Sequence, residues 1–307
     1  MVDRPPVPSV GVVVATHNRP ALMRKALESI LAQDHPGLIE VVLVFDRSEP
    51  DATLERSEDG RRVRVLTNNR SPGLAGARNT GILALKTDIV AFCDDDDTWL
   101  QGKLTAQLGR LTDSPAAEFV TTAMRVNMEG QITVRQAGRT QVDLQDFIRS
   151  RMAMLHSSSF LFRRDAMLDG FGLVDEAIPN SMGEDWDLLM RAARRQPIEH
   201  VDEPLIDVLW GATSYFNDVW QDKNAAHLWL LEKHPEMSRD KIGAAMMLGK
   251  LAFGHAAMGN RREALRFVGK CMRTRVREPR SVLALLVVCG VPAGWVQERL
   301  NRLGHGV

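Results

Sequence analysis

Short runs of apolar, β-branched residues alternate with segments of helical periodicity along the first third of the chain. The apolar runs predict strands, and apolar positions spaced three and four residues apart predict helices between them. We expect four strands, at residues 10–15, 39–45, 63–66 and 89–93. Helices are expected at residues 20–31, 75–85 and 100–111, with a loop or an exposed helix at 49–62. This alternation is typical of an α/β domain with a parallel sheet.

Further strands are predicted in the middle of the chain, and only helices beyond about Asn217. Those strands are expected at residues 119–126, 131–135 and 157–164. Near the C-terminus, helical patterns at 244–258 and 262–272 flank Gly259 and Asn260, which predicts a helical hairpin. We therefore expect a first domain of residues 1–215 and an α-helical C-terminal extension of residues 216–307.

Polar side chains follow each of the first four predicted strands: Thr16, Asp46, Asn68 and the run Asp94–Asp97. The carboxyl ends of parallel strands meet at one edge of a sheet, so these groups are expected to face a common crevice. Four neighbouring carboxylates repel one another, and such a cluster is stable only with a cation or in contact with water. At the start of the first helix, Asn18 is the expected N-cap and Pro20 suits the first turn.

Composition narrows the class of protein. The chain has 39 basic and 39 acidic residues and no net charge, which argues against a nucleic-acid partner. Its three cysteines are far apart in sequence, so neither a zinc site nor a disulfide framework is expected. No apolar signal segment is seen near the N-terminus, and no apolar run reaches the roughly 18 residues that span a bilayer. A reducing, cytoplasmic location fits these features best.

Five segments in order make the sequence resemble glycosyltransferase family 2, from about residue 8 to about residue 210. The segments are Val12–Pro20, Val44–Ser48, Gly76–Ile82, Phe92–Trp99 and Gly183–Arg191. The resemblance implies a GT-A fold, a Rossmann-like and mostly parallel sheet flanked by helices. It also implies an inverting transfer of sugar from a nucleoside-diphosphate sugar to an acceptor hydroxyl, with Mn²⁺ or Mg²⁺ bound.

The resemblance assigns the donor site to residues at the strand ends. Thr16 and Asp46 would hold the base, with Asp46 accepting a hydrogen bond from a pyrimidine ring N–H. Arg78 would reach the base or the diphosphate, and Asp95 would lie near the ribose. Asp94 and Asp96 would form the family's DxD motif, with Asp96 binding the cation directly. The family often has a second aspartate at Phe45 and a glycine at Arg47, so a UDP- or dTDP-sugar is favoured without being fixed.

The chemistry requires a cation on the leaving diphosphate and a base for the acceptor hydroxyl. Hard divalent cations prefer oxygen ligands, which suits carboxylates. Asp185 is the candidate base, with Glu184 as its helper. Alternatively, the segment Ser181–Glu184 is a capping-box pattern, in which Glu184 would cap a helix and Asp185 would favour the helix dipole.

Other interpretations stay open at this point. Asp94-x-Asp96-x-Thr98 also fits the DxDxT motif of haloacid-dehalogenase-like phosphatases, with Asp94 as nucleophile and Asp96 as acid/base. That motif usually begins its domain, whereas three strands precede it here, so the phosphatase ranks lower. A non-catalytic protein that binds sugar nucleotide or acts as a scaffold is a third hypothesis.

The sequence leaves the histidine metal ligand and the acceptor open. A histidine ligand late in the domain could be His200 or His227, and His156 could touch acceptor or phosphate or serve only as a structural hydrogen-bonder. The acceptor could be a saccharide, a lipid-linked sugar or a small molecule.

A basic stretch stands beside an apolar run near the C-terminus. Residues 261–280 include eight basic and two acidic residues, and residues 282–288 are apolar. Such a pairing can bind an anionic membrane surface, here the inner face of the cell membrane. The alternative, slightly favoured, is a buried terminal helix with a solvated basic neighbour.

Overall fold

The computed structural model describes residues 7–128, 130–210 and 219–302. The chain divides into two compact units. The sheet unit comprises Met1–Leu144, Met152–Glu176 and Glu184–Gly211, and the helical unit comprises Gln145–Arg151, Ala177–Gly183 and Ala212–Val307. The expected boundary between residues 215 and 216 lies outside the described residues.

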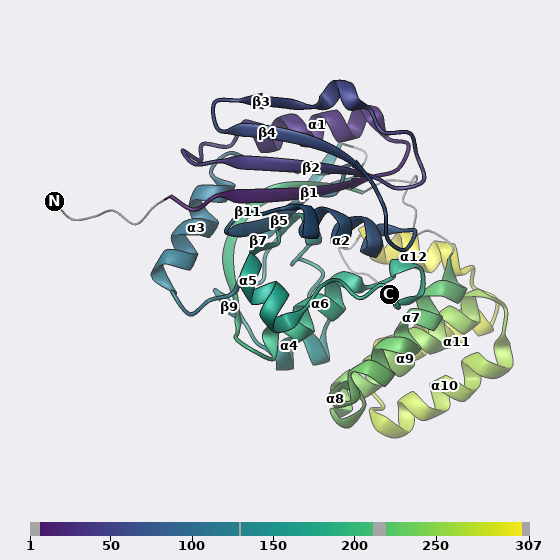
Figure 1. The fold of residues 1–307 in the computed structure, drawn as a ribbon. Coiled ribbons are helices and arrows are strands. Elements are labelled where there is room, and N and C mark those ends of the chain that lie inside the picture. Colours follow the sequence, from purple (N-terminus) through teal and green to yellow (C-terminus); the bar gives the residue numbers. More distant parts are fainter. Residues whose placement is uncertain (1–6, 129, 211–218, 303–307) are drawn as a thin grey trace. The chain divides into compact units, whose positions relative to one another are not determined.

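In the described part of the sheet unit, eleven strands form one mixed sheet in the order β3-β4-β2-β1-β5-β10-β7-β11-β6, with β8 paired to β7 and β9 paired to β11 (Figure 1). The strands are β1 (Val10–Thr16), β2 (Ile39–Phe45), β3 (Arg56–Glu58), β4 (Arg61–Thr67), β5 (Ile89–Phe92), β6 (Thr98–Trp99), β7 (Phe119–Met128), β8 (Gln131–Arg135), β9 (Gln141–Val142), β10 (Leu161–Arg163) and β11 (Ile198–Trp210). Strands β4, β2, β1 and β5 are mutually parallel, which confirms the predicted α/β sheet. Their carboxyl ends therefore share one edge.

Helices cover both faces of the parallel strands. They are α1 (Pro20–Leu31), α2 (Leu74–Ala84), α3 (Lys103–Asp113), the short α5 (Arg164–Ala166) and α6 (Glu184–Ala193). Side chains alternate along β1, so Val12 faces the core beneath α1, whereas Val13 lies against Gly81 of α2. A Cβ at Gly81 would come within 2.5 Å of the Val13 side chain, and glycine thus lets α2 approach the strand.

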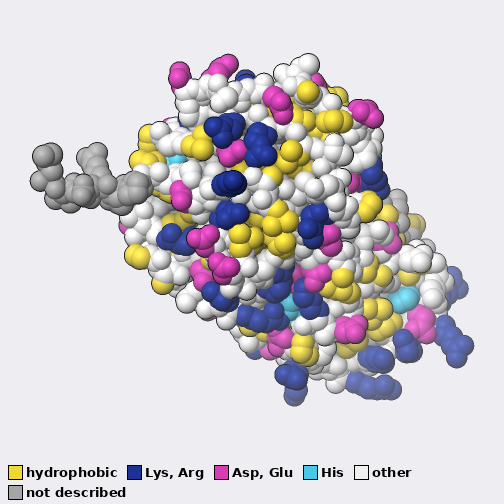
Figure 2. All heavy atoms as spheres, viewed as in Figure 1, with side chains coloured by type: hydrophobic (Ala, Val, Ile, Leu, Met, Phe, Trp, Pro, Cys, Tyr) yellow, Lys and Arg dark blue, Asp and Glu magenta, His cyan; other side chains and the backbone are white. Residues whose placement is uncertain are grey.

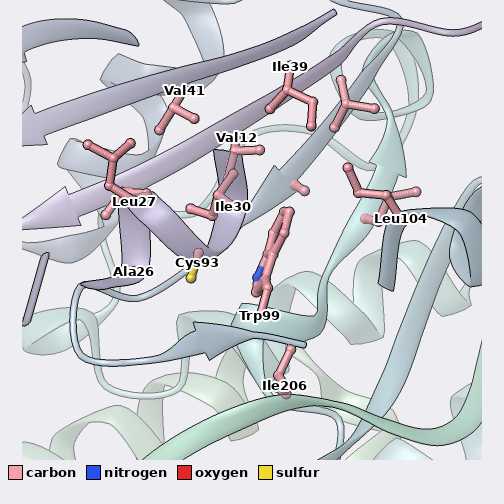
Figure 3. Packing of buried hydrophobic residues seen from close by; sticks show 14 of the residues in the cluster. Val12, Ala26, Leu27, Ile30, Ile39, Val41, Cys93, Trp99, Leu104 and Ile206 are labelled. Atoms are coloured by element: carbon pink, nitrogen blue, oxygen red, sulfur yellow. The ribbon is translucent and has the colours of Figure 1, made fainter. Parts of the chain in front are cut away.

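The core beneath α1 is made by its apolar stripe and by distant parts of the chain. Figure 3 shows the α1 side chains over the strands, with Trp99 and Ile206 closing the cluster from β6 and β11. The labelled members are Val12, Ala26, Leu27, Ile30, Ile39, Val41, Cys93, Trp99, Leu104 and Ile206, all buried. The strand-end residues are thus carried on a rigid, fully packed layer.

Three local expectations were wrong. Residues 49–62 form a 3₁₀ turn at Ala52–Leu54 and then the edge strand β3, which pairs with β4. Only Leu161–Arg163 of the expected strand 157–164 is extended, because Ser157–Ser159 forms a 3₁₀ turn capped by His156. Asn18 does not cap α1; its φ is +53°, and Arg19 occupies the cap position without a side-chain cap bond.

Lys103, at the start of α3, is a fully buried lysine of the sheet unit. Its Nζ donates to Oε1 of Gln107 at 2.7 Å and lies 3.8 Å from the ring centroid of Trp99. Burial lowers the pKa of Lys103 to about 7, since the charged form loses its hydration.

We expect Lys103 to make stability depend on pH. An unfolded lysine has a pKa of about 10.4, so between pH 7 and 10 the unfolded chain holds a proton that the folded chain lacks. Stability should therefore rise with pH over this window, by up to about 4 kcal/mol for one such group. Urea unfolding across that range should show a clearly smaller rise for Lys103→Met. The exposed Lys25→Met is the control, and an unchanged rise in Lys103→Met would contradict the assignment.

The helical unit contains α7 (Trp220–Lys233), α8 (Pro235–Arg239), α9 (Lys241–Ala257), α10 (Arg261–Thr274), α11 (Pro279–Val288) and α12 (Ala293–Arg302), together with residues 145–149 of α4 (Leu144–Arg149). Asp240 caps α9 by accepting from the N–H groups of Ile242 and Gly243, each at 2.9 Å. The core of this unit joins Leu251 and Phe253 of α9 to Phe267 of α10 and Ala284 of α11. The expected hairpin of α9 and α10 is present.

The surface of α10 and α11 is basic and partly apolar. Figure 2 shows Lys and Arg side chains along the part of the surface where α10 lies. Val282 and Leu286 of α11 are 55% and 44% exposed, so this helix is not fully buried. Among the described residues, no helix has the length and apolar character needed to cross a bilayer.

Candidate functional site

The run Asp94–Asp97 leaves the carboxyl end of β5, and its four carboxylates have different partners. Asp97 is 1% exposed and accepts from the Ser158 hydroxyl at 2.5 Å and from the Leu209 N–H at 3.3 Å. Burial, followed by repulsion from Asp94 and Asp96, raises the pKa of Asp97 well above its usual range. Asp97 therefore holds the loop in place from inside, a role that the sequence did not reveal.

Asp95 joins β5 to the end of β1. Its Oδ2 accepts from the Thr16 hydroxyl at 2.8 Å and from the His17 N–H at 3.4 Å. The His17 ring in turn hydrogen-bonds through Nδ1 to the Asp46 carbonyl oxygen, at 2.7 Å. Hydrogen bonds thus connect the three residues expected at the nucleoside, which are Thr16, Asp95 and Asp46.

The Asp46 carboxylate is held by three donors. Asn68 Nδ2 donates to Oδ1 at 2.8 Å, and Oδ2 accepts from the Gly73 N–H at 3.1 Å and from Arg47 Nε at 2.9 Å. Burial alone would raise the pKa of Asp46, but these hydrogen bonds hold it below its usual range. Asp46 is therefore an ionised, oriented acceptor at the end of β2.

Arg78 links the aspartate run to the start of α6. It is 2% exposed, its Nη2 lies 2.6 Å from Asp94 Oδ1, and its Nη1 lies 2.5 Å from Glu184 Oε1. Burial raises the pKa of Glu184 to about 7, with the nearby Arg78 opposing that shift. Glu184 is thus a buried ion-pair partner of Arg78, and the capping-box interpretation of Ser181–Glu184 is not needed to explain it.

Asp185 is the second residue of α6 and is half-buried. Its Oδ1 accepts from the N–H of Trp186 at 2.8 Å. Since Glu184 and Asp185 are adjacent, the Arg78–Glu184 ion pair fixes the helical turn that carries Asp185.

Asp96 is partly exposed to solvent and forms an ion pair with Arg19. Its Oδ2 is 2.6 Å from Arg19 Nη1, which is also 3.5 Å from Asp95 Oδ1. The side chains of Asp94 and Asp96 are 24% and 29% exposed, so both have faces open to a ligand. Burial and the neighbouring Asp94 raise the pKa of Asp96, which is the signature of a cluster short of positive charge. The donor set of carboxylate oxygens fits a hard divalent cation.

A second group of possible ligand atoms lies deeper in the site. One atom each from Asp94, Asp97 and His156 falls within 4.8 Å of the others. His156 Nδ1 is 3.3 Å from Asp97 Oδ2. His200, by contrast, is 1% exposed, with Nδ1 bonded to the Thr121 hydroxyl and Nε2 to Asp202, so both ring nitrogens are engaged within the sheet.

Glu176 is a residue near the site to which the sequence assigned no role. Its two oxygens accept from Arg70 Nε at 2.5 Å, from Asn79 Nδ2 at 2.7 Å and from the Ser71 hydroxyl at 2.6 Å. Burial opposes ionisation, but these hydrogen bonds prevail and lower the pKa of Glu176 to about 2. The residue fixes the turn before α2, the helix that carries Arg78. Its pairing in sequence with Asp175 was the available signal.

Comparisons with known proteins point to one family. The model of glycosyl transferase family 2 matches residues 11–171. The succinoglycan biosynthesis protein ExoO of Rhizobium meliloti is 31% identical over 198 residues, which are 61% of this chain and 56% of that protein. A Campylobacter jejuni protein, GalNAc(5)-diNAcBac-PP-undecaprenol beta-1,3-glucosyltransferase, is 27% identical over 158 residues, 48% of this chain and 50% of that protein. The chain thus spans about half the length of these relatives.

Solved structures share the fold at low identity. The crystal structure of S. aureus TarS 1-349 in complex with UDP-GlcNAc matches with a TM-score of 0.60 and 18% identity, covering 87% of this chain and 81% of that one. The match supports a GT-A fold for this chain.

Proposed function

Because the chain belongs to glycosyl transferase family 2, we propose that it transfers a sugar from a UDP-sugar, or less favourably a dTDP-sugar, to an acceptor hydroxyl with inversion. One observation carries the proposal. The buried Arg78 bridges Asp94, in the aspartate run, and Glu184, beside Asp185, at 2.6 and 2.5 Å. Arg78 thereby links the aspartate run, where the leaving diphosphate is proposed to bind, to the helical turn that carries the candidate base Asp185.

In this proposal the donor lies along the edge that joins β1, β2 and β5. Thr16 and Asp46 contact the base, Asp95 contacts the ribose, and Arg78 contacts the base or the diphosphate. Asp96 and Asp94 hold Mn²⁺ or Mg²⁺, which when bound neutralises charge on the leaving diphosphate. The observation of UDP-GlcNAc in the similar TarS structure supports a uridine donor.

The acceptor hydroxyl loses its proton to Asp185 as it attacks the sugar carbon from the side opposite the leaving group. Glu184 assists by keeping Arg78 and the first turn of α6 in place.

The acceptor is proposed to be a lipid-linked saccharide. The name of the Campylobacter jejuni relative specifies an acceptor linked to undecaprenol through a diphosphate. The basic and apolar surface of α10 and α11 offers a means of peripheral attachment to an anionic membrane. The family match favours sugar transfer over the DxDxT phosphatase.

A thermal-shift screen of nucleoside diphosphates, with and without Mn²⁺, tests the donor. UDP with Mn²⁺ should raise Tm more than dTDP, and much more than GDP or ADP, because a ligand at about 100 times its Kd stabilises by about 2.7 kcal/mol. Inorganic phosphate serves as the control for nonspecific anion effects. A larger shift with GDP, or equal shifts for all four nucleotides, would contradict the assigned base.

A further inference from the structure

Arg47 follows Asp46 at the carboxyl end of β2, and its backbone adopts a strained conformation. Its φ is +48°, a region that residues other than glycine rarely occupy. Asn18, with a φ of +53°, leaves β1 in the same way. The last residues of these strands, Thr16 and Phe45, are paired, so the two strained residues lie on neighbouring strands at one edge of the sheet. Backbone strain of this kind is concentrated at binding and active sites.

The Arg47 side chain is only partly engaged by the protein. Its Nε donates to Asp46 Oδ2 at 2.9 Å, and the side chain is 55% exposed. Within the described ranges, no residue accepts a hydrogen bond from either terminal nitrogen, Nη1 or Nη2. Glycine would adopt this φ without strain, so what arginine adds at this position is its guanidinium group.

The Asp46 carboxylate keeps one acceptor position open. Its Oδ2 accepts from the Gly73 N–H at 3.1 Å and from Arg47, which occupies both lone pairs of that oxygen. Among the described residues, its Oδ1 accepts only from Asn68 Nδ2, at 2.8 Å. The Asp46 side chain is 8% exposed, so a ligand can reach little of it. This edge therefore offers one carboxylate acceptor with guanidinium donors beside it.

Such a pair of groups is complementary to the imide edge of a nucleobase. In uracil and thymine the ring N3–H donates and the neighbouring C4 carbonyl accepts, which matches a carboxylate beside a guanidinium. Cytosine has no hydrogen at N3 and carries an amino group at C4, so it opposes both protein groups. Adenine also lacks a ring N–H at the matching position. Guanine has the same pair of groups on a larger ring, so hydrogen bonding alone does not reject it.

We propose that Arg47 determines specificity by donating from a terminal nitrogen to the C4 carbonyl of the uracil, beside the contact of Asp46 with N3–H. This inference rests on the proposed function, in which Asp95 contacts the ribose. Asp95 follows β5, and the sheet order β2-β1-β5 puts it two strands from β2. C4 lies opposite the ring atom that bears the ribose, so C4 rather than C2 faces the end of β2.

Calorimetric titrations of the full chain with UDP and with CDP, both in the presence of Mn²⁺, test the inference. The two nucleotides carry the same phosphates and differ only at N3 and C4 of the base. Arg47→Gly should weaken UDP binding at least tenfold, because it removes a charged hydrogen-bond donor. It should not weaken CDP binding, so the ratio of the two affinities should fall at least tenfold. The variant should fold, since glycine is compatible with the positive φ.

Asp59→Gly is the matched control. Asp59 also has a positive φ, of +27°, but it lies in the turn before β4, at the edge of the sheet opposite the strand ends that form the site. This variant should bind both nucleotides as wild type does. Arg47→Met keeps a long side chain without a donor and should lose the same discrimination as Arg47→Gly.

Three outcomes would overturn the inference and leave the proposed function standing. They are an unchanged UDP affinity in Arg47→Gly, equal losses of UDP and CDP affinity in that variant, and an equal loss of UDP affinity in Asp59→Gly. Equal losses of UDP and CDP affinity would assign Arg47 to the phosphates. By contrast, a wild-type chain that does not bind UDP, or binds CDP more tightly, would refute the proposed donor itself.

Discussion

Asp185→Asn is expected to abolish sugar transfer, lowering kcat by about 10²–10⁴-fold, while UDP and Mn²⁺ still bind. Asparagine keeps the shape of the side chain and can still accept from the Trp186 N–H, but it cannot take the proton of the acceptor hydroxyl. The Arg78–Glu184 ion pair is untouched, so the start of α6 should remain in place. Transfer is measured by release of UDP in the presence of acceptor, and nucleotide binding by calorimetry.

Asp165→Asn provides the matched control, because the Asp165 side chain is 91% exposed and lies outside the site. It should transfer sugar as wild type does. Should Asp185→Asn retain wild-type kcat, another group must be the base. Loss of UDP binding together with activity would instead assign Asp185 to donor binding.

The second large effect is expected from Asp96→Asn. We expect the gain in UDP affinity that Mn²⁺ gives to fall by at least about 100-fold, roughly 2.7 kcal/mol. An amide oxygen is a weak, neutral ligand, and the variant also leaves Arg19 without its closest carboxylate. Metal-free binding of UDP should change little, because Thr16, Asp46 and Asp95 are still in place.

Titrations of UDP with and without Mn²⁺ separate the metal-free affinity for UDP from the gain in affinity that Mn²⁺ gives. Asp165→Asn again serves as the control. A full Mn²⁺ effect in Asp96→Asn would remove Asp96 from the metal site. The group formed by Asp94, Asp97 and His156 would then be the remaining candidate among the described residues.

Regular alternation made the sheet predictable. Buried β-branched strands and the period of α1 are local signals, and they identified β1, β2, β4 and β5 and the edge at which Thr16, Asp46 and Asp94 meet. The resemblance to a family then supplied roles that periodicity cannot give. The structure shows that these residues lie at one edge of the sheet. Their roles are proposals, which the variants described above test.

What the sequence could not show depends on contacts between distant residues. The ion pair between Glu184 and Arg78 could not be predicted, because the two residues are 106 positions apart in sequence. The sequence assigned no role to Asp97, because its hydrogen-bond donors, the Ser158 hydroxyl and the Leu209 N–H, are distant in sequence. The strand expected at 157–164 was cut short because the serines that look extended in sequence turn to donate to Asp94 and Asp97.

Arg19 has a further consequence for the order in which ligands bind. If Asp96 binds the cation as proposed, a divalent ion would compete with Arg19, whose Nη1 lies 2.6 Å from Asp96 Oδ2, so metal alone should bind weakly. The diphosphate of a bound donor would offer the Arg19 guanidinium another anionic partner and so free Asp96 for the metal. We therefore expect thermodynamic linkage, in which metal and donor each raise the affinity of the other.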